Sequence, residues 1–191
     1  MTLSALVQAL RHRLARLAHD ERGVSAVEFA VLLPFMFLLY MGGVEVSQAV
    51  ATDRKVTMVA RSVADLVSRT TSVSDADMTD TFNAAAAVVA PFPTSKLKVT
   101  LSSVSINAQG VAKVVWSNGY NTAPRSVGST VTIPAALNVA NTSLIWGEVS
   151  YGYTPTIGYV LTGTMNLTDQ MYMRPRLSTC VARVTSSGSV C

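Results

Sequence analysis

The chain has 191 residues, of which 49% are hydrophobic and only 14% are charged. This length allows one modest domain, and so low a charged fraction is more typical of a chain with a membrane segment than of an ordinary soluble enzyme. The formal net charge is +4, but no basic patch interleaved with aromatic residues appears, so the charge does not indicate nucleic-acid binding.

Residues 1–23 are predicted to form a cytoplasmic leader. Four arginines stand before the first long apolar run, against two acids, and by the positive-inside rule they hold the amino end in the cytoplasm. Apolar residues at helical spacing between Leu3 and Leu17 allow an amphipathic helix on the inner membrane surface. A leader that only sets the topology is the alternative. The charged residues are Arg11, Arg13, Arg16, Arg22, Asp20 and Glu21.

The longest apolar run, residues 24–44, predicts a transmembrane helix. Its roughly 21 residues, at ~1.5 Å each, span the ~30 Å hydrocarbon core of a bilayer. One carboxylate, Glu28, interrupts the run near its start. A charge inside a span costs about 2.5 to 3.5 kcal/mol on the insertion scale, so Glu28 is a candidate functional residue. Pro34 is expected to kink the helix, which membrane helices tolerate.

The residues around Glu28 resemble a processing signal. The run Arg22-Gly23-Val24-Ser25-Ala26-Val27-Glu28-Phe29-Ala30 places a glycine five residues before the glutamate and an aromatic residue directly after it. This pattern is similar to the class III prepilin cleavage site of type IV pilus systems, and it most resembles the TadE-like pseudopilins of the tight-adherence (Flp pilus) branch. The resemblance implies cleavage between Gly23 and Val24 by a prepilin peptidase, and a role for Glu28 and Phe29 in subunit assembly. The main Flp pilin is far shorter and usually has Glu-Tyr, so the chain resembles a minor, pilin-like component.

A conventional signal peptide is the alternative interpretation of this segment. Ala49-Val50-Ala51 offers a cleavage site after the apolar run. The long amino-terminal region, the carboxylate inside the run and the length of the run argue against it.

Beyond Val44 an amphipathic helix is predicted to continue outside the membrane over residues 45–69, with Asp53 interrupting its apolar side. The predicted apolar stripe is Val46, Ala49, Val50, Val56, Val59, Ala60, Val63, Leu66 and Val67, and the predicted polar face is Gln48, Thr52, Lys55, Ser62, Asp65 and Arg69.

Residues 70–191 predict a small, strand-rich antiparallel head across the membrane, which makes the fold class α+β. After a turn at residues 70–74, Ser74 is the expected cap of a second helix that Pro91 stops. Alternation with period two then predicts strands. These are residues 97–104, 111–116, 130–133, 143–153, 164–173 and 177–184, with turns at 107–110 and 118–119.

The two cysteines, Cys180 and Cys191, are expected to form a disulfide on the oxidising side of the membrane. A zinc site is not expected, because the only histidines, His12 and His19, lie in the leader. The tail adds to the resemblance, since three of its features recur in TadE/TadG-like proteins. These are Tyr151-Gly152-Tyr153-Thr154-Pro155, Arg174-Pro175-Arg176 and the final Cys191.

No catalytic residue, metal or cofactor is predicted. Trimming after Gly23 would remove both histidines and with them most hydrolytic mechanisms. Glu148 and Asp169 are the only acids after Asp80 and are expected at the surface, while the acids at 75, 77 and 80 lack the glycine and distal glutamate of a calcium loop. The aromatic residues of the head are expected in the core, with a binding face for a glycan or partner subunit as the alternative. They are Trp116, Tyr120, Trp146, Tyr151, Tyr153, Tyr159 and Tyr172.

We therefore predict a non-enzymatic pseudopilin for assembly of a tight-adherence type IV pilus. It would be a single-pass protein of the bacterial inner membrane with a periplasmic head, in or at the base of a pilus. Its expected partners are prepilin peptidase, other pilin and pseudopilin subunits, and the pilus assembly platform. The alternative is a membrane-anchored periplasmic adhesin or binding module in which Glu28 is incidental.

Overall fold

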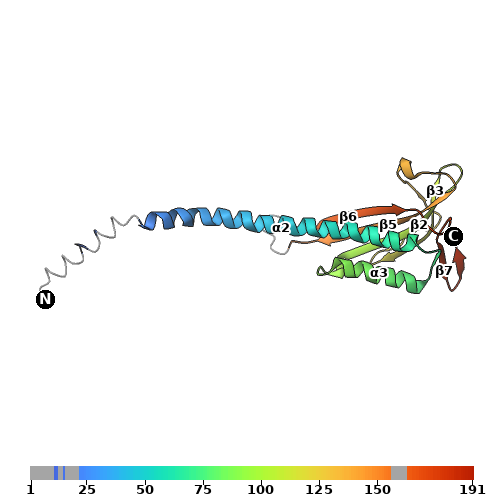
Figure 1. Ribbon diagram of the computed structural model, residues 1–191, viewed down its shortest axis with the longest axis horizontal. Helices are drawn as coiled ribbons and strands as arrows, with labels where there is room; N and C mark the ends of the chain where they lie inside the picture. The colour runs from blue at the N-terminus through green and yellow to red at the C-terminus, as the bar shows by residue number, and fades with distance from the viewer. Residues whose placement is uncertain (1–10, 13–14, 16–21, 156–162) are drawn as a thin grey trace. The chain divides into compact units, whose positions relative to one another are not determined.

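The computed structural model describes residues 11–12, 15, 22–155 and 163–191 (Figure 1). Most of the predicted leader, and Tyr159, lie outside these residues. The chain divides into two compact units, Met1–Val44 and Glu45–Cys191. Its class is α+β, as predicted, with a long apolar helix followed by strand-rich antiparallel structure.

Helix α2, Arg22–Ser68, confirms the predicted long helix and continues through Pro34. In the first unit its large apolar side chains from Val24 to Tyr40 are all between 47% and 78% exposed. A helix that is apolar on every side is stable only when a membrane or other helices surround it. Among the described residues, α2 is the one helix long and apolar enough to cross a membrane.

In the second unit one face of α2 is buried, but the buried face is narrower than predicted. Val46, Val50 and Leu66 are 46% to 48% exposed, and Asp53 is also exposed. At ~3.6 residues per turn, the buried stripe of α2 is centred on positions 56 and 63, and the exposed side chains lie on its flanks. Thr52, predicted on the polar face, is buried, and its hydroxyl donates to the Gln48 carbonyl at 2.8 Å. The buried apolar residues are Val56, Val59, Ala60, Val63, Ala64 and Val67.

Helix α3, Asp75–Val89, begins at the predicted cap. The backbone N–H of Asp77 donates to the Ser74 hydroxyl at 3.2 Å, and the backbone N–H of Ser74 donates to the Asp77 carboxylate at 2.8 Å. These bonds satisfy backbone donors that a helix start otherwise leaves unpaired. At the other end of α3, Lys55 Nζ donates to the carbonyls of Val88 and Ala90 at 3.0 and 2.7 Å, which ties α3 to α2.

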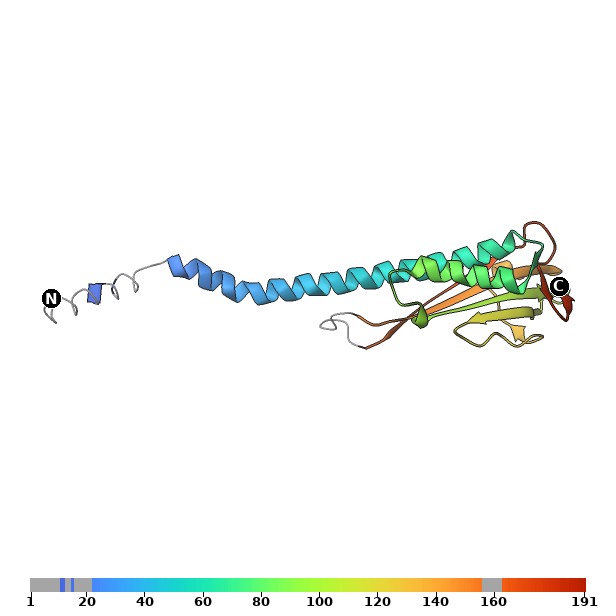
Figure 2. The ribbon, with the colours of Figure 1, turned by 90° about the horizontal axis from the view of Figure 1, so that it is seen from below.

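A five-stranded antiparallel sheet forms the centre of the second unit, in the order β4-β3-β2-β5-β6. Helices α2 and α3 cover one of its faces (Figure 2). The helix-facing core contains Val99, Val149 and Trp116, and a smaller core on the opposite face contains Leu144 and Trp146. The strands are β2 (Leu97–Ile106), β3 (Ala112–Tyr120), β4 (Thr130–Val131), β5 (Thr142–Tyr153) and β6 (Met165–Met173), with 3-10 turns η1 (Thr94–Lys96) and η2 (Ala135–Leu137).

The hairpin turn predicted at residues 107–110 joins β2 to β3, and Gly110 adopts the positive φ of +75° that it requires. The turn predicted at Asn118-Gly119 is wrong, because Gly119 pairs with Thr100 inside the β2–β3 ladder. The chain turns two residues later, at Asn121, whose φ is 52°. Gly119 is needed for a close approach, since a Cβ there would lie 2.2 Å from the Thr122 carbonyl oxygen.

The carboxy-terminal strands form a second sheet in the order β1-β7-β8. The strand predicted over 177–184 begins only at β7 (Ala182–Thr185), because Leu177 is 68% exposed and packs no core. The predicted turn at 70–74 contains β1 (Ser72–Val73), which pairs in parallel with β7. The last strand is β8 (Gly188–Val190).

Candidate processing and assembly site

Gly23 lies in the first turn of α2, next to the residue that begins the helix. A Cβ atom built on Gly23 would meet nothing within 4 Å, and Val24 is 55% exposed. Packing within the described chain therefore does not explain the glycine. The bond between Gly23 and Val24 lies on an open stretch of helix.

Glu28 and Phe29 are both exposed in the first unit, and Phe29 is 58% exposed. Glu28 follows Val24 by four residues, so the two lie on the same side of α2. The helix thus brings the predicted cleavage and assembly residues together within about two turns. The predicted cysteines lie at the far end of the chain and belong to the second unit.

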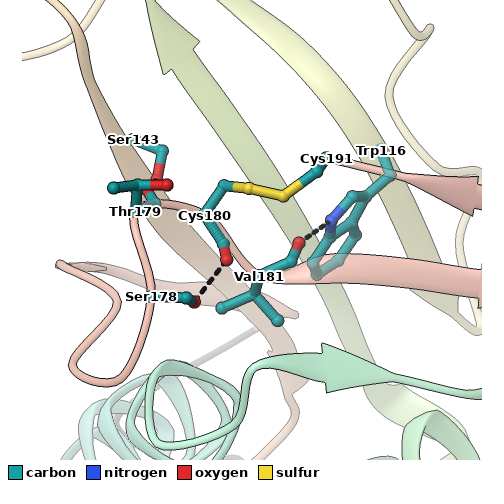
Figure 3. The surroundings of a disulfide bond; sticks show 7 residues. All are labelled: Trp116, Ser143, Ser178, Thr179, Cys180, Val181 and Cys191. Carbon is teal, nitrogen blue, oxygen red and sulfur yellow. Dashed lines mark hydrogen bonds between the residues drawn. A yellow bond between two sulfur atoms is a disulfide. The ribbon is translucent and has the colours of Figure 1, made fainter.

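The disulfide joins Cys180 to Cys191, with a Cα–Cα distance of 5.9 Å (Figure 3). Beside it, the buried Val181 accepts a hydrogen bond through its carbonyl from Trp116 Nε1 at 2.8 Å. The Ser143 hydroxyl donates to the Thr179 carbonyl at 2.5 Å. The disulfide therefore closes a segment that is already bonded to β3 and β5.

Arg176 of the Arg174-Pro175-Arg176 motif contacts the last turn of helix α2. The backbone N–H of Arg176 donates to the Ser68 carbonyl at 2.8 Å, and the Arg176 guanidinium lies 2.5 Å from the Asp65 carboxylate. Asp65 also pairs with Arg69 at 2.5 Å. The hydrogen bond from Arg69, with the charge of Arg176 acting in the same direction, lowers the pKa of Asp65 below its ordinary value.

The Tyr151-Gly152-Tyr153 motif belongs to the core, since the two tyrosines are 2% and 3% exposed. Tyr151 donates its hydroxyl to the Pro93 carbonyl at 3.2 Å. Burial raises the pKa of Tyr153, and the Glu45 carboxylate raises it further. Glu45 is itself only 1% exposed, and the sequence interpretation did not consider it. The sequence did mark this residue as a candidate, because Glu45 is the first charged residue after the apolar run.

Arg183 is a second buried charge that the sequence interpretation missed. It is 6% exposed, donates to the Asn118 side chain at 2.9 Å and to the Val73 carbonyl at 3.1 Å, and forms an ion pair with Asp75. One side chain thereby ties β1, β3 and the start of α3 to β7. One indication of this burial was present in the sequence, because Arg183 occupies an inward position of a predicted strand.

The aromatic side chains of the head are mainly core, as expected. Trp116 and Trp146 are 4% and 5% exposed. Glu148, expected at the open surface, is instead half-buried and receives two hydrogen bonds from Arg125, at 2.6 and 2.7 Å. Within the residues that the structure describes, no cluster of three or more His, Cys, Asp or Glu could hold a metal ion.

Residues 23–65 match the family described as TadE-like protein. No curated protein and no solved structure matches the chain. The match begins at Gly23, on the predicted cleavage bond, and ends at Asp65, the residue that Arg176 binds. It therefore includes the exposed apolar half of α2 and most of the half that packs in the head. Helix α2 thus carries a TadE-like segment, from a family of Tad pilus components that is not known as enzymatic.

Proposed function

We propose that this protein is a minor pilin-like subunit, a pseudopilin, used in assembling a tight-adherence type IV pilus. The observation that carries the proposal is the TadE-like match over residues 23–65, which begins at the predicted cleavage glycine and covers the exposed apolar helix. Such a helix needs apolar surroundings. The membrane provides them before assembly, and the packed helices of a filament core provide them after it.

In this proposal the amino end lies in the cytoplasm and the head in the periplasm. The arginines before the apolar run support this orientation through the positive-inside rule. The disulfide between Cys180 and Cys191 also supports it, because such bonds persist in oxidising compartments. The protein is anchored in the inner membrane by residues 24–44 and is structural rather than catalytic.

A prepilin peptidase removes residues 1–23 and leaves Val24 as the new amino terminus. The amine of Val24, with an unperturbed pKa of about 7.7 to 8.0, then carries a positive charge close to Glu28. When two such helices pack side by side, the Glu28 carboxylate of one subunit meets the amine of its neighbour. Leaving either charge unpaired in low dielectric is costly, so the pair sets the register of the helices more than it adds net stability.

The test replaces Glu28 and follows assembly in membranes. A photo-crosslinking residue at Leu39, which is 78% exposed, reports contacts with pilin partners. Glu28→Ala is expected to insert and to be largely trimmed, yet to lose these crosslinks and to reduce surface pili. Glu28→Asp should be partly impaired because its side chain is shorter, and Ser25→Ala, on the same helix, is the control that should behave like the wild type.

Normal crosslinks and normal piliation in Glu28→Ala would remove Glu28 from the mechanism. The alternative function, a membrane-anchored periplasmic adhesin or binding module, makes a different prediction. In that protein Glu28 is incidental, and the mature amino terminus need not be Val24.

A further inference from the structure

Helices α2 and α3 lie side by side on one face of the sheet, and each has an outer face that points away from it (Figure 2). The two helices run in opposite directions, because α3 begins just after α2 ends and the residues at the end of α3 accept the hydrogen bonds of Lys55. Together the two outer faces form one surface of the second unit.

The outer face of α2 in the second unit carries an exposed methionine between two arginines. It lies half a turn away from the buried stripe centred on positions 56 and 63, and its residues recur at intervals of three and four. This spacing is typical of a helix that packs along another helix. Met58, at the centre of the face, is 49% exposed. The residues of the face are Ser47, Ala51, Arg54, Met58, Arg61 and Asp65.

The outer face of α3 carries small side chains and one carboxylate. It lies opposite the buried side chains of Met78, Phe82 and Ala85, and its residues also recur at intervals of three and four. All of them are exposed, and α3 contains no basic residue. The alanines also favour the helix itself, so small side chains alone would not indicate a contact. The residues of the face are Ala76, Asp80, Asn83 and Ala87.

The two outer faces complement each other in charge and in side-chain size. Within the part of the chain that the structure describes, Arg61 and Asp80 are exposed and neither forms an ion pair. The Asp65 carboxylate is already bound by Arg69 and Arg176, so the α2 face is left positive. The long, flexible methionine of the α2 face fits against a helix whose outer side chains are short.

Two copies of the chain can make both contacts at once. A two-fold axis parallel to α2 places α2 of each copy over α3 of the other. Both α2 helices then enter the heads in the same direction, as two chains anchored in one membrane require. A partner of another kind would have to supply both a basic helix and a smooth acidic one, and the chain itself carries both.

The same axis determines the height at which the side chains meet. Lys55 of α2 lies about level with residues 88–90 of α3. Counting ~1.5 Å per residue in opposite directions, Met58 is level with Ala87 to within about two residues, and Arg61 lies about one turn from Asp80. A rotation about an axis parallel to α2 does not change these heights. Met58 of one copy therefore meets Ala87 of the other, and the Arg61 guanidinium can reach the Asp80 carboxylate.

We propose that the outer face of α2 in one copy of this protein packs on the outer face of α3 in a second copy, with Arg61 paired to Asp80 at both contacts. Exposed ion pairs add little stability, so they set the register of the dimer, and confinement to one membrane raises the effective concentration of the copies. The inference rests on the proposed membrane anchorage, but it needs neither Glu28 nor cleavage after Gly23. A missing dimer would leave trimming and piliation unaffected, and a precursor that is not trimmed would still form the dimer.

The experiment crosslinks two differently tagged full-length chains in the membranes of a host without pilus genes, where a second copy is the only pilin-like partner. One chain carries Met58→Cys and the other Ala87→Cys, and a mild oxidant joins cysteines whose Cα atoms approach within about 7 Å. The mixed pair should give a disulfide-linked dimer on non-reducing gels. Each variant alone should give little dimer, because the axis places the two copies of one position at opposite corners of the four helices. Lys113→Cys, at an exposed position on β3, is the control that should not crosslink to Ala87→Cys.

Charge reversal in the same cysteine pair tests the proposed ion pair. Arg61→Glu and Asp80→Arg should each lower the crosslinked fraction about five-fold, because each places like charges at both contacts. Combining the two reversals in every chain restores opposite charges and should restore the dimer. Arg54→Glu is the matched control, because it makes the same charge change at an exposed position about two turns away, and it should leave the crosslinked fraction unchanged.

Unchanged thermal melting shows that each variant is folded. The proposal is overturned if the mixed pair gives no more dimer than the Lys113→Cys control, or if each cysteine variant alone crosslinks as strongly as the mixed pair. It is also overturned if Arg61→Glu and Arg54→Glu crosslink equally, or if the combined reversal does not restore the dimer.

Discussion

Replacing Cys191 by alanine should lower the stability of the head without disturbing its packing. Cys191 is exposed, so its truncation leaves no cavity. The disulfide closes a loop with a sequence separation of 11 residues. On the chain-entropy account a loop of this length stabilises the folded state by about 2.8 kcal/mol. For a domain of this size that corresponds to a melting temperature lower by about 6 to 11 °C.

The assay follows tryptophan fluorescence during thermal unfolding of the full chain. Trp116 is a direct reporter, because its indole donates to the carbonyl of Val181, one residue from Cys180. Adding reductant to the wild type should lower its melting temperature to that of Cys191→Ala, and should leave the variant unchanged.

Cys180→Ala, Cys191→Ala and the double variant should melt within a degree or two of one another, because each removes the same crosslink. Ser189→Ala, an exposed neighbour, is the control and should melt like the wild type. The reasoning is refuted if the single variants melt like the oxidised wild type, or if free thiols titrate in the folded native protein.

Two further predictions concern packing and pH, and a third concerns processing. Gly147→Val should destabilise the head by about 1 to 3 kcal/mol in denaturant unfolding, because a Cβ atom there would lie 3.1 Å from the Ala60 carbonyl oxygen and 3.2 Å from the Val63 side chain. Gly152→Val is the control and should be better tolerated, because a Cβ atom at Gly152 would have no contact closer than 3.6 Å. The pKa of Asp65 is lower in the folded state than in the unfolded state, where it is near 3.8. Its ionised carboxylate therefore contributes fully to stability above pH 3.8, and this contribution is lost as the pH falls through the folded-state pKa. Denaturant titrations should show a smaller loss of stability in acid for Asp65→Asn than for the wild type, and an unchanged acid profile would contradict the pairing. Gly23→Asp should leave the full-length precursor in the membrane on immunoblots, and normal trimming of this variant would count against the cleavage site.

The elements that the sequence predicted best are those whose signals are local. Helix α2 followed from an apolar run and its amphipathic continuation, and the start of α3 followed from Ser74 and the acids after it. The boundaries of β5 were predicted within one residue, because its period-two alternation is long and Pro155 follows it. In each case the residues that determine the element lie inside or next to it.

The features that the sequence did not reveal depend on contacts between distant segments. Arg176 binds Asp65 across 111 positions, so the Arg-Pro-Arg motif was visible but its contact with the last turn of α2 was not. Strand β1 exists only because β7 pairs with it. Gly119 resembled a turn residue, although its role is a close backbone approach within a strand.

The residues of the candidate site show the same difference between local and long-range signals. The disulfide partners could be paired because the chain has two cysteines, whereas the burial of Glu45 and Arg183 depends on the packed head.

The central claim is that this protein is processed and used as a pilin-like subunit, and mass spectrometry of its mature amino terminus tests it most directly. The account predicts that the protein purified from membranes begins at Val24, one residue after Gly23. A full-length chain, or a chain that begins at Thr52 after signal-peptide cleavage, would contradict it.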